Sequence, residues 1–411
     1  MAQINITLNQ EEILQLLATD REDAFKDLLS ASLNSVLQAE SSEQIQAGRY
    51  ERSEDRQDSR NGFRDRPLTT RIGKITLHVP RHRNTPFETM VFDNFARSES
   101  ALISTMAEMC VEGVSTRKVT KVMETLCDQT YSKSTVSNVC KQLDSAVADF
   151  RQRPLDFEYP FVIIDATYFK TRENHRIISK PLMIALGVNE SGIKEIIGFE
   201  IYESETKESW SAFLESLKAR GLHGVKMITS DAHDGILAAV CKTFPTVPWQ
   251  RCQYHFTKNI LEDTPKKYQE GLRSELTEMF NAEDKSAARK RKDEIISDYM
   301  DIAEKSMKCL DEGFDAAMTV MTLPIKIRKP FRTSNHLERL NEELKRRSKV
   351  IGIFPNAGSI IRLMGSVLME NHEHFQGMWK LFYKPDRNKL ELIVDDLERI
   401  AAEQKMLLQA A

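Results

Sequence analysis

The chain has 411 residues, of which 41% are hydrophobic and 29% charged, a balance typical of folded globular proteins. A chain of this length can form two to four domains, and its net charge of -3 argues against a uniformly basic nucleic-acid binder. No apolar run approaches the roughly 20 residues of a membrane span, and the N-terminus lacks the pattern of a signal peptide, so a cytoplasmic protein without membrane contact is expected.

Residues 1–95 are predicted to form a helical and basic N-terminal region for DNA binding or dimerisation. Apolar residues at helical spacing, from Phe25 to Leu37, predict a helix, and a polar stretch that predicts loops follows it. The alternation of apolar residues in "KITLHVP" predicts a short strand, at an edge or in a hairpin, that ends at Pro80.

Two segments carry an excess of positive charge. From Arg49 to Arg83 there are ten bases and five acids, and from Lys326 to Lys349 there are nine bases and three acids. Such an excess can follow a phosphate backbone, although a solvated surface is the common alternative. If these segments contact DNA, the residues expected to do so are Arg60, Arg64, Arg81, Arg346 and Arg347.

Residues 96–153 contain two successive helical patterns. Ser115 is placed to cap the first helix, and Ser134 is predicted to cap a second helix whose inward apolar positions continue to Val147. The second helix begins with short polar and basic side chains suited to groove and phosphate contacts. The expected DNA contacts are Lys133, Ser134, Asn138 and Lys141. The pattern predicts a helix-turn-helix domain, and an ordinary two-helix hairpin is the alternative.

Residues 154–255 change to strand patterns. Three strands are predicted in "PFVIID", "PLMIALGVN" and "IKEIIGFEIY", followed by a helix that stops at Gly221, a strand in "VKMITSD", a helix, and a strand in "VPWQRCQYH". The order β-β-β-α-β-α-β predicts an α/β fold with a mixed sheet. Residues 256–330 read as a charged helical insertion, and residues 331–411 as the last, helical part of the same core.

Two aspartates follow strand patterns, and their placement suggests a metal site. Asp165 ends the first predicted strand and Asp231 the fourth, so parallel pairing of these strands would bring both carboxylates to one edge of the sheet. Like charges this close are stable together when a divalent cation neutralises them, and Mg²⁺ prefers such oxygen ligands. A third acid is expected from a later helix, where spacing allows either Glu338 or Glu342.

The sequence resembles the bacterial Mutator-type transposases of insertion sequences over nearly its whole length. The motifs that carry the resemblance include "GVSTRKV", "STVSNV", "DATYFK", "SDAHDGI", "WQRCQYHFTKNI" and "TSNHLERLNEELKRRSKVIGIFPN". The resemblance implies a ribonuclease H-like mixed sheet with a helical insertion, and an acid triad of Asp165, Asp231 and Glu338. It thereby selects Glu338 over Glu342.

The resemblance also implies a reaction and its partners. Two Mg²⁺ or Mn²⁺ ions held by the triad would activate water, and then a liberated 3'-hydroxyl, for attack on phosphorus during DNA cleavage and strand transfer. The expected partners are the terminal inverted repeats of the element, target DNA and a second copy of the chain, since two ends must be held together. The alternatives are a ribonuclease H-like nuclease or resolvase without strand transfer, and a non-catalytic DNA-binding regulator.

The motif "CQYH" contains two further candidate residues, Cys252 and His255. A zinc site needs about four ligands, and the six cysteines include no second pair at suitable spacing. His255 is instead expected near the scissile phosphate, or as a packing and hydrogen-bonding group. His233 is similarly placed to assist or orient.

Overall fold

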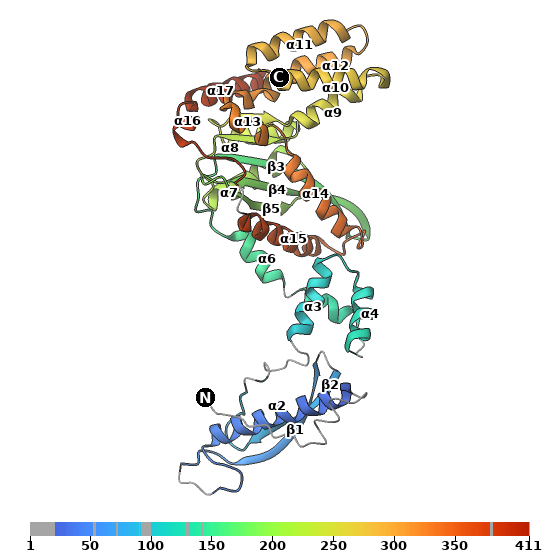
Figure 1. The fold of residues 1–411 in the computed structure, drawn as a ribbon, viewed down its shortest axis with the longest axis vertical. Helices are drawn as coiled ribbons and strands as arrows, with labels where there is room; N and C mark the ends of the chain where they lie inside the picture. The colour runs from blue at the N-terminus through green and yellow to red at the C-terminus, as the bar shows by residue number, and fades with distance from the viewer. Residues whose placement is uncertain are drawn as a thin grey trace. The chain divides into compact units, whose positions relative to one another are not determined.

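The computed structural model describes residues 21–51, 55–70, 73–89, 91, 100–127, 131–141, 143–378 and 381–410. The chain divides into two compact units, residues 1–142 and 143–411 (Figure 1). None of the helices in the described part of the chain is long and apolar enough to cross a membrane. The finer division into five segments stays a prediction.

The described residues of the N-terminal unit include helix α2 (Arg21–Ile45) and a hairpin of β1 (Arg60–Thr70) and β2 (Gly73–His82). The predicted strand is confirmed as part of a hairpin, but its predicted end at Pro80 is wrong. Pro80 pairs with Phe63 at a register shift, where a missing N–H group is tolerated, so β2 continues to His82. The polar stretch before this strand was predicted to form loops, but it contains strand β1. Its residues are mostly polar and exposed, so they show no clear alternating pattern.

Three helices follow in the same unit: α3 (Ser100–Val111), α4 (Thr116–Cys127) and α5 (Lys133–Cys140). They share a core that includes Met106, Val119, Met123, Val136 and Val139. The cap at Ser115 is confirmed, because its Oγ accepts a hydrogen bond of 3.4 Å from the Lys118 amide.

The prediction for the next helix is wrong in two respects. Its N-cap is Ser132 rather than Ser134, since Ser132 Oγ accepts from the Thr135 amide at 3.1 Å. The helix also does not continue to Val147: α5 ends at Cys140, and α6 (Leu143–Gln152) belongs to the second unit, where it packs against α15 (Ala357–Gly377). A continuous apolar stripe thus covered two helices that bury their apolar sides in different cores.

The second unit contains a five-stranded mixed sheet in the order β5-β4-β3-β6-β7. The strands are β3 (Phe161–Glu173), β4 (Arg176–Val188), β5 (Lys194–Ile201), β6 (Met227–Ser230) and β7 (Trp249–Arg251). β3 pairs antiparallel with β4 and parallel with β6, so the mixed sheet and the order of strands along the chain are as predicted. The first and fourth predicted strands lie side by side in parallel, the condition on which the shared edge of the two aspartates depended.

Helices cover both faces of this sheet (Figure 1). On one face, Val162 and Ile164 of β3 pack in a core with α7 (Lys207–Ala219) and α8 (Asp234–Thr243). On the other, Phe161 stacks on Phe331 of α13 (Ile325–Phe331) with ring centroids 3.8 Å apart, and α14 (Asn335–Ser348) contacts β3. Because side chains alternate along a strand, Asp165 shares the second face with Phe161.

The segment predicted as a helical insertion contains four helices with a core of their own. It comprises α9 (Gln253–Glu262), α10 (Lys266–Phe280), α11 (Lys285–Tyr299) and α12 (Glu304–Ala317). Phe256 of α9 packs in this core with Leu276 and Phe314. The short helix η1 (Thr319–Thr322) leads back to the sheet, and α16 (Arg387–Glu391) and α17 (Val394–Ala410) complete the chain.

Candidate active site

Asp165 lies in the middle of β3, and not at the end of a strand as the sequence suggested. What ends near it is the pairing with β6, whose last pair is Ile163 with Thr229. Beyond that point β3 stays paired with β4 as far as Glu173 and Arg176, while its other edge is next met at Thr171, which forms a parallel bridge with Phe354. Asp165 therefore lies where the edge of β3 that β6 covered becomes free.

The Asp165 carboxylate is held by one backbone and one side-chain donor. The Ala166 amide donates to Oδ1 at 2.9 Å, and Asn341 Nδ2 of α14 donates to Oδ2 at 2.8 Å. Burial raises the pKa of Asp165 to about 6, against the effect of the Ala166 amide and of His255, while Asp231 and Glu338 raise it further. Burial removes the water that would stabilise the ionised Asp165 carboxylate, and a bound cation can stabilise it in place of that water.

Asp231 directly follows β6, and its Oδ1 accepts from the Ala232 amide at 2.7 Å. Glu338 lies in the first turn of α14, and Ser334 Oγ donates to its Oε1 at 3.4 Å. Burial is the main cause that raises the pKa of Glu338. The alternative acid of the same helix, Glu342, is exposed.

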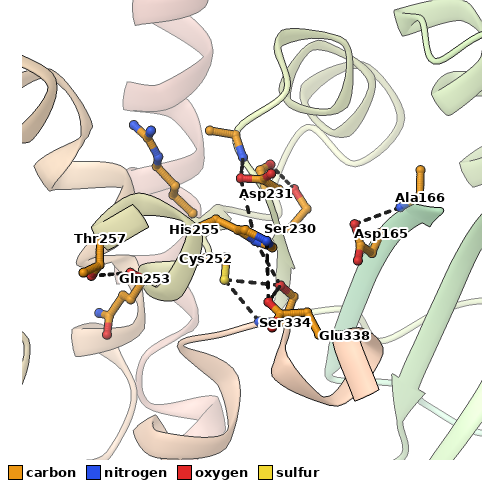
Figure 2. A network of polar contacts seen from close by, with 12 residues as sticks. Asp165, Ala166, Ser230, Asp231, Cys252, Gln253, His255, Thr257, Ser334 and Glu338 are labelled. Atoms are coloured by element: carbon orange, nitrogen blue, oxygen red, sulfur yellow. Dashed lines mark hydrogen bonds and ion pairs between the residues drawn. The ribbon is translucent and has the colours of Figure 1, made fainter. Parts of the chain in front are cut away.

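His255 of α9 connects two of the three acids. Its Nδ1 is 3.8 Å from Asp231 Oδ1 and its Nε2 is 3.6 Å from Glu338 Oε1, and Figure 2 shows the ring between them. A hydrogen bond with Cys252 is the main cause that raises the pKa of His255 to about 9, against the effect of burial, and both acids add to it. His255 is therefore a cation at neutral pH in the metal-free site.

Cys252 lies beside His255 and is fully buried. Ser334 donates to its Sγ twice, from the amide at 3.3 Å and from Oγ at 3.2 Å. His233, the other predicted accessory residue, caps α8 instead: its Nδ1 accepts from the Gly235 amide at 3.2 Å.

Three predicted DNA contacts, Arg60, Arg346 and Arg347, have partners within the protein. The Arg60 guanidinium donates to Ser42 Oγ at 2.8 Å and to the carbonyl of Ala47 at 2.9 Å, at the end of α2. Arg347 is 5% exposed and lies 2.6 Å from Glu343, which also binds the exposed Arg346 at 2.7 Å. These contacts stabilise the fold whether or not DNA is bound.

The remaining predicted DNA contacts lie on exposed surface of the first unit. Arg64 and Arg81 project from the β1–β2 hairpin, and Ser134, Asn138 and Lys141 from α5. Lys133 begins α5, but its side chain lies outside the described residues. No contact tests these residues, so they stay predictions.

Sequence reasoning missed Asn341 and a group of basic residues beyond Asp165. Asn341 is three positions after Glu338, so both lie on one face of α14, and this spacing was the available signal. The basic group lies near the tip of the β3–β4 hairpin and consists of exposed side chains: Lys170, Arg172 and Arg176. The sequence signal for it was weak because the bases alternate with apolar and acidic residues.

Comparisons with known proteins agree on one family. Residues 1–378 match the family described as Transposase, Mutator family. The chain is 42% identical to the transposase for insertion sequence element IS256 in transposon Tn4001 of Staphylococcus aureus, over 91% of this chain and 97% of that protein. It is 37% identical to the transposase for insertion sequence element IS1081 of Mycobacterium tuberculosis, over 90% of this chain and 89% of that protein.

The chain is also similar to a third transposase, and one solved structure was matched to it. The transposase for insertion sequence element ISRM5 of Rhizobium meliloti is 36% identical over 86% of this chain and 89% of that protein. The Mos1 transposase paired-end complex with left transposon end covers 56% of this chain and 82% of its own at 15% identity. Its TM-score of 0.16 is too low to support any conclusion.

Proposed function

The chain belongs to the Mutator family of transposases, and we propose that it cleaves DNA at the ends of an insertion sequence and joins the ends to target DNA. The acid triad of Asp165, Asp231 and Glu338 would perform both steps. The sheet that positions the first two acids would be of the ribonuclease H-like type.

The convergence of three acids from distant parts of the chain carries this proposal. Asp165 comes from β3, Asp231 follows β6, and Glu338 comes from α14. The charges of Asp231 and Glu338 raise the pKa values of both Asp165 and His255, so the groups lie close enough to interact. Oxygen donors of this kind fit Mg²⁺ or Mn²⁺, which would be held by these carboxylates. When bound, two such ions would supply activation of the attacking oxygen and stabilisation of the leaving oxygen.

The chain's own residues prepare this site. Asn341 orients Asp165 through its hydrogen bond of 2.8 Å, and the Ala166 amide fixes the second carboxylate oxygen. His255 offsets the mutual repulsion of Asp231 and Glu338 in the metal-free protein, since it lies within ion-pair distance of both. The carboxylates are thereby kept near each other before any cation binds.

DNA recognition is assigned to the first unit. Helices α4 and α5 would form a helix-turn-helix in which the exposed side chains of Asn138 and Lys141 contact DNA. Two element ends must be joined to one target, so the functional species would be a homodimer.

Three conservative substitutions test the proposal. Asp165→Asn, Asp231→Asn and Glu338→Gln should each abolish Mg²⁺-dependent cleavage of a labelled element end, while binding to that end stays within a few-fold of wild type. Cleavage retained in any of the three would refute the triad. Cleavage without joining, when target DNA and a free 3'-hydroxyl end are both supplied, would favour a nuclease or resolvase, and binding with no product a regulator.

A further inference from the structure

Glu338 has a second set of neighbours besides the two aspartates. The Sγ atom of Cys252, a ring nitrogen of His255 and a carboxylate oxygen of Glu338 all lie within 4.8 Å of one another, as Figure 2 allows the reader to follow. The sequence placed only Cys252 and His255 close together and therefore argued against a zinc site. Folding adds a third donor from α14, more than eighty positions later in the chain.

The donor atoms of this cluster differ in kind from those of the acid triad. One sulfur, one nitrogen and one oxygen suit Zn²⁺ and related thiophilic cations, whereas Mg²⁺ prefers oxygen ligands alone. Three protein ligands leave a fourth position open for water, as in many zinc sites. The sulfur also accepts two hydrogen bonds from Ser334, of 3.3 and 3.2 Å, which fix its position.

The cluster stands on rigid supports. The Cys252 amide donates to the Ser230 carbonyl of β6 at 2.8 Å, which ties the start of α9 to the sheet. On the same helix, Gln253 Nε2 donates to the Ala317 carbonyl at 2.9 Å, and Phe256 packs in the core of the insertion. Cys252, the N-cap of α9, and His255 in its first turn are therefore held by both the sheet and the insertion.

We propose that Cys252, His255 and Glu338 form a binding site for a thiophilic divalent cation, with Zn²⁺ as the expected ion. Binding releases the thiol proton of Cys252 and one ring proton of the His255 imidazolium to solvent, and forms bonds from the metal to sulfur, nitrogen and oxygen. Occupancy removes Glu338 from the magnesium ligands, so Zn²⁺ inhibits DNA cleavage. This inhibition rests on the proposed function, whereas the binding of the metal does not.

Titration of the metal-free, full-length protein with Co²⁺ tests the binding. A thiolate bound to Co²⁺ gives a charge-transfer absorption band in the near ultraviolet, and added Zn²⁺ should remove it. We expect the band in wild type and its loss in Cys252→Ser. Two controls should keep it: Cys241→Ser, which alters a half-buried cysteine of α8, and Asp165→Asn, which alters an acid outside the cluster. No band in wild type, or a band that persists in Cys252→Ser, would overturn the proposal.

Because replacing the buried Cys252 can disturb folding, a second variant alters Glu338, a ligand that is partly exposed. Glu338→Gln should keep the band but lower the Co²⁺ affinity by about tenfold, the order of effect expected when one metal ligand is weakened. In cleavage assays at fixed Mg²⁺, wild type should be inhibited at Zn²⁺ concentrations about tenfold lower than Cys252→Ser, each relative to its own activity without Zn²⁺. Equal sensitivity would overturn the inhibitory role. A band in a protein that cleaves nothing would retain the metal site and reject the transposase chemistry.

Discussion

The helical insertion and the edge of the sheet at Asp165 use the same charged residue types in opposite ways. In the insertion, acids and bases neutralise one another across neighbouring helices. Arg291 of α11 lies 3.2 Å from Glu278 and 3.5 Å from Glu275 of α10, and Arg289 lies 2.7 Å from Asp315 of α12. These pairs connect neighbouring helices of the insertion.

The acids at the sheet edge near Asp165 are not neutralised by Lys or Arg side chains in this way. In the described part of the chain, the ion pairs of Asp231 and Glu338 are with His255 alone, and Asp165 has none. Local charge counts along the sequence do not separate the two regions, because both contain acids near bases. Pairing in the fold separates them, and carboxylates left without a basic side chain are the ones available to a cation.

The largest difference between the regions is expected in activity. Asp165→Asn should lower the rate of DNA cleavage by about a thousandfold or more, because it removes a charged metal ligand at the reacting phosphate. The matched change Asp315→Asn, in an exposed ion pair of the insertion, should leave the rate within about threefold. Single-turnover cleavage of a labelled element end measures both. Equal losses in the two variants would remove the distinction between paired and unpaired acids.

A smaller loss is expected from a residue that only orients a ligand. Asn341→Ala removes the donor to Asp165 Oδ2 and should lower cleavage by about 10- to 100-fold, with a higher Mg²⁺ concentration needed for half-maximal rate. The control is Asn281→Ala, which removes a side-chain bond of 2.8 Å to Arg332 at the end of α10. A loss in Asn341→Ala that no Mg²⁺ concentration restores even in part would argue against a positioning role.

Stability should change in the opposite sense to activity. The pKa of Asp165 rises from 3.8 to about 6 on folding, so the folded protein binds more protons than the unfolded chain between these values, and stability falls as the pH increases through them. Asp165→Asn removes this cost, and its amide can donate to Asn341 Oδ1, a buried atom without a hydrogen-bond partner. In EDTA, the variant should be more stable by about 1 to 3 kcal/mol at pH 7.

Urea unfolding at several pH values measures this effect. The advantage of Asp165→Asn should shrink below pH 6 and vanish only well below pH 3.8, where the wild-type carboxyl is protonated in both the folded and the unfolded state. Asp315→Asn should instead lose up to about 1 kcal/mol, as expected for an exposed ion pair. A wild type more stable than Asp165→Asn at pH 7 would contradict the description of Asp165 as a buried carboxylate that lacks an ion-pair partner and costs stability.

The sequence predicts the sheet better than it predicts the completed site. Apolar alternation and turn residues locate the strands along the chain, because these are local properties. The parallel pairing of β3 and β6, which brings Asp165 and Asp231 to one edge, joins strands that are not consecutive, and the sequence offered it only as a condition. The choice of Glu338 over Glu342 came only from resemblance. It depends on how α14 packs against β3, which no spacing within α14 reveals.

The same limit explains the other differences. His255 and Cys252 were visible as a motif, but their approach to Glu338 depends on the start of α9 being tied to the sheet through Ser230. The end of α5 at Cys140 was missed because an apolar stripe reports burial and not which core receives it. Long-range packing, rather than local preference, decides these features.

The smallest predicted effect concerns the basic residues at the tip of the β3–β4 hairpin. In the described residues, Arg172 and Arg176 at the hairpin tip are exposed and have no acidic partner, whereas Arg289 and Arg291 of the insertion are paired. A two-residue turn with positive φ at Asn174 and His175 connects β3 to β4 and holds the tip bases in place. Bases without an acidic partner can neutralise phosphates without first breaking an ion pair, so this tip should contact the DNA backbone.

Replacing Arg172 and Arg176 together by alanine should weaken binding to an element end by about tenfold and reduce the slope of log affinity against log salt by about 2, as expected for two lost phosphate contacts. Replacing Arg289 and Arg291 should leave the slope unchanged and instead lower the stability by about 1 kcal/mol, because their role is to pair acids between helices. Fluorescence anisotropy over a range of salt concentrations distinguishes these results. If the insertion variant lost the larger part of the salt slope, its bases would exchange protein partners for phosphates on binding, and pairing in the free protein would no longer mark the surface that DNA avoids.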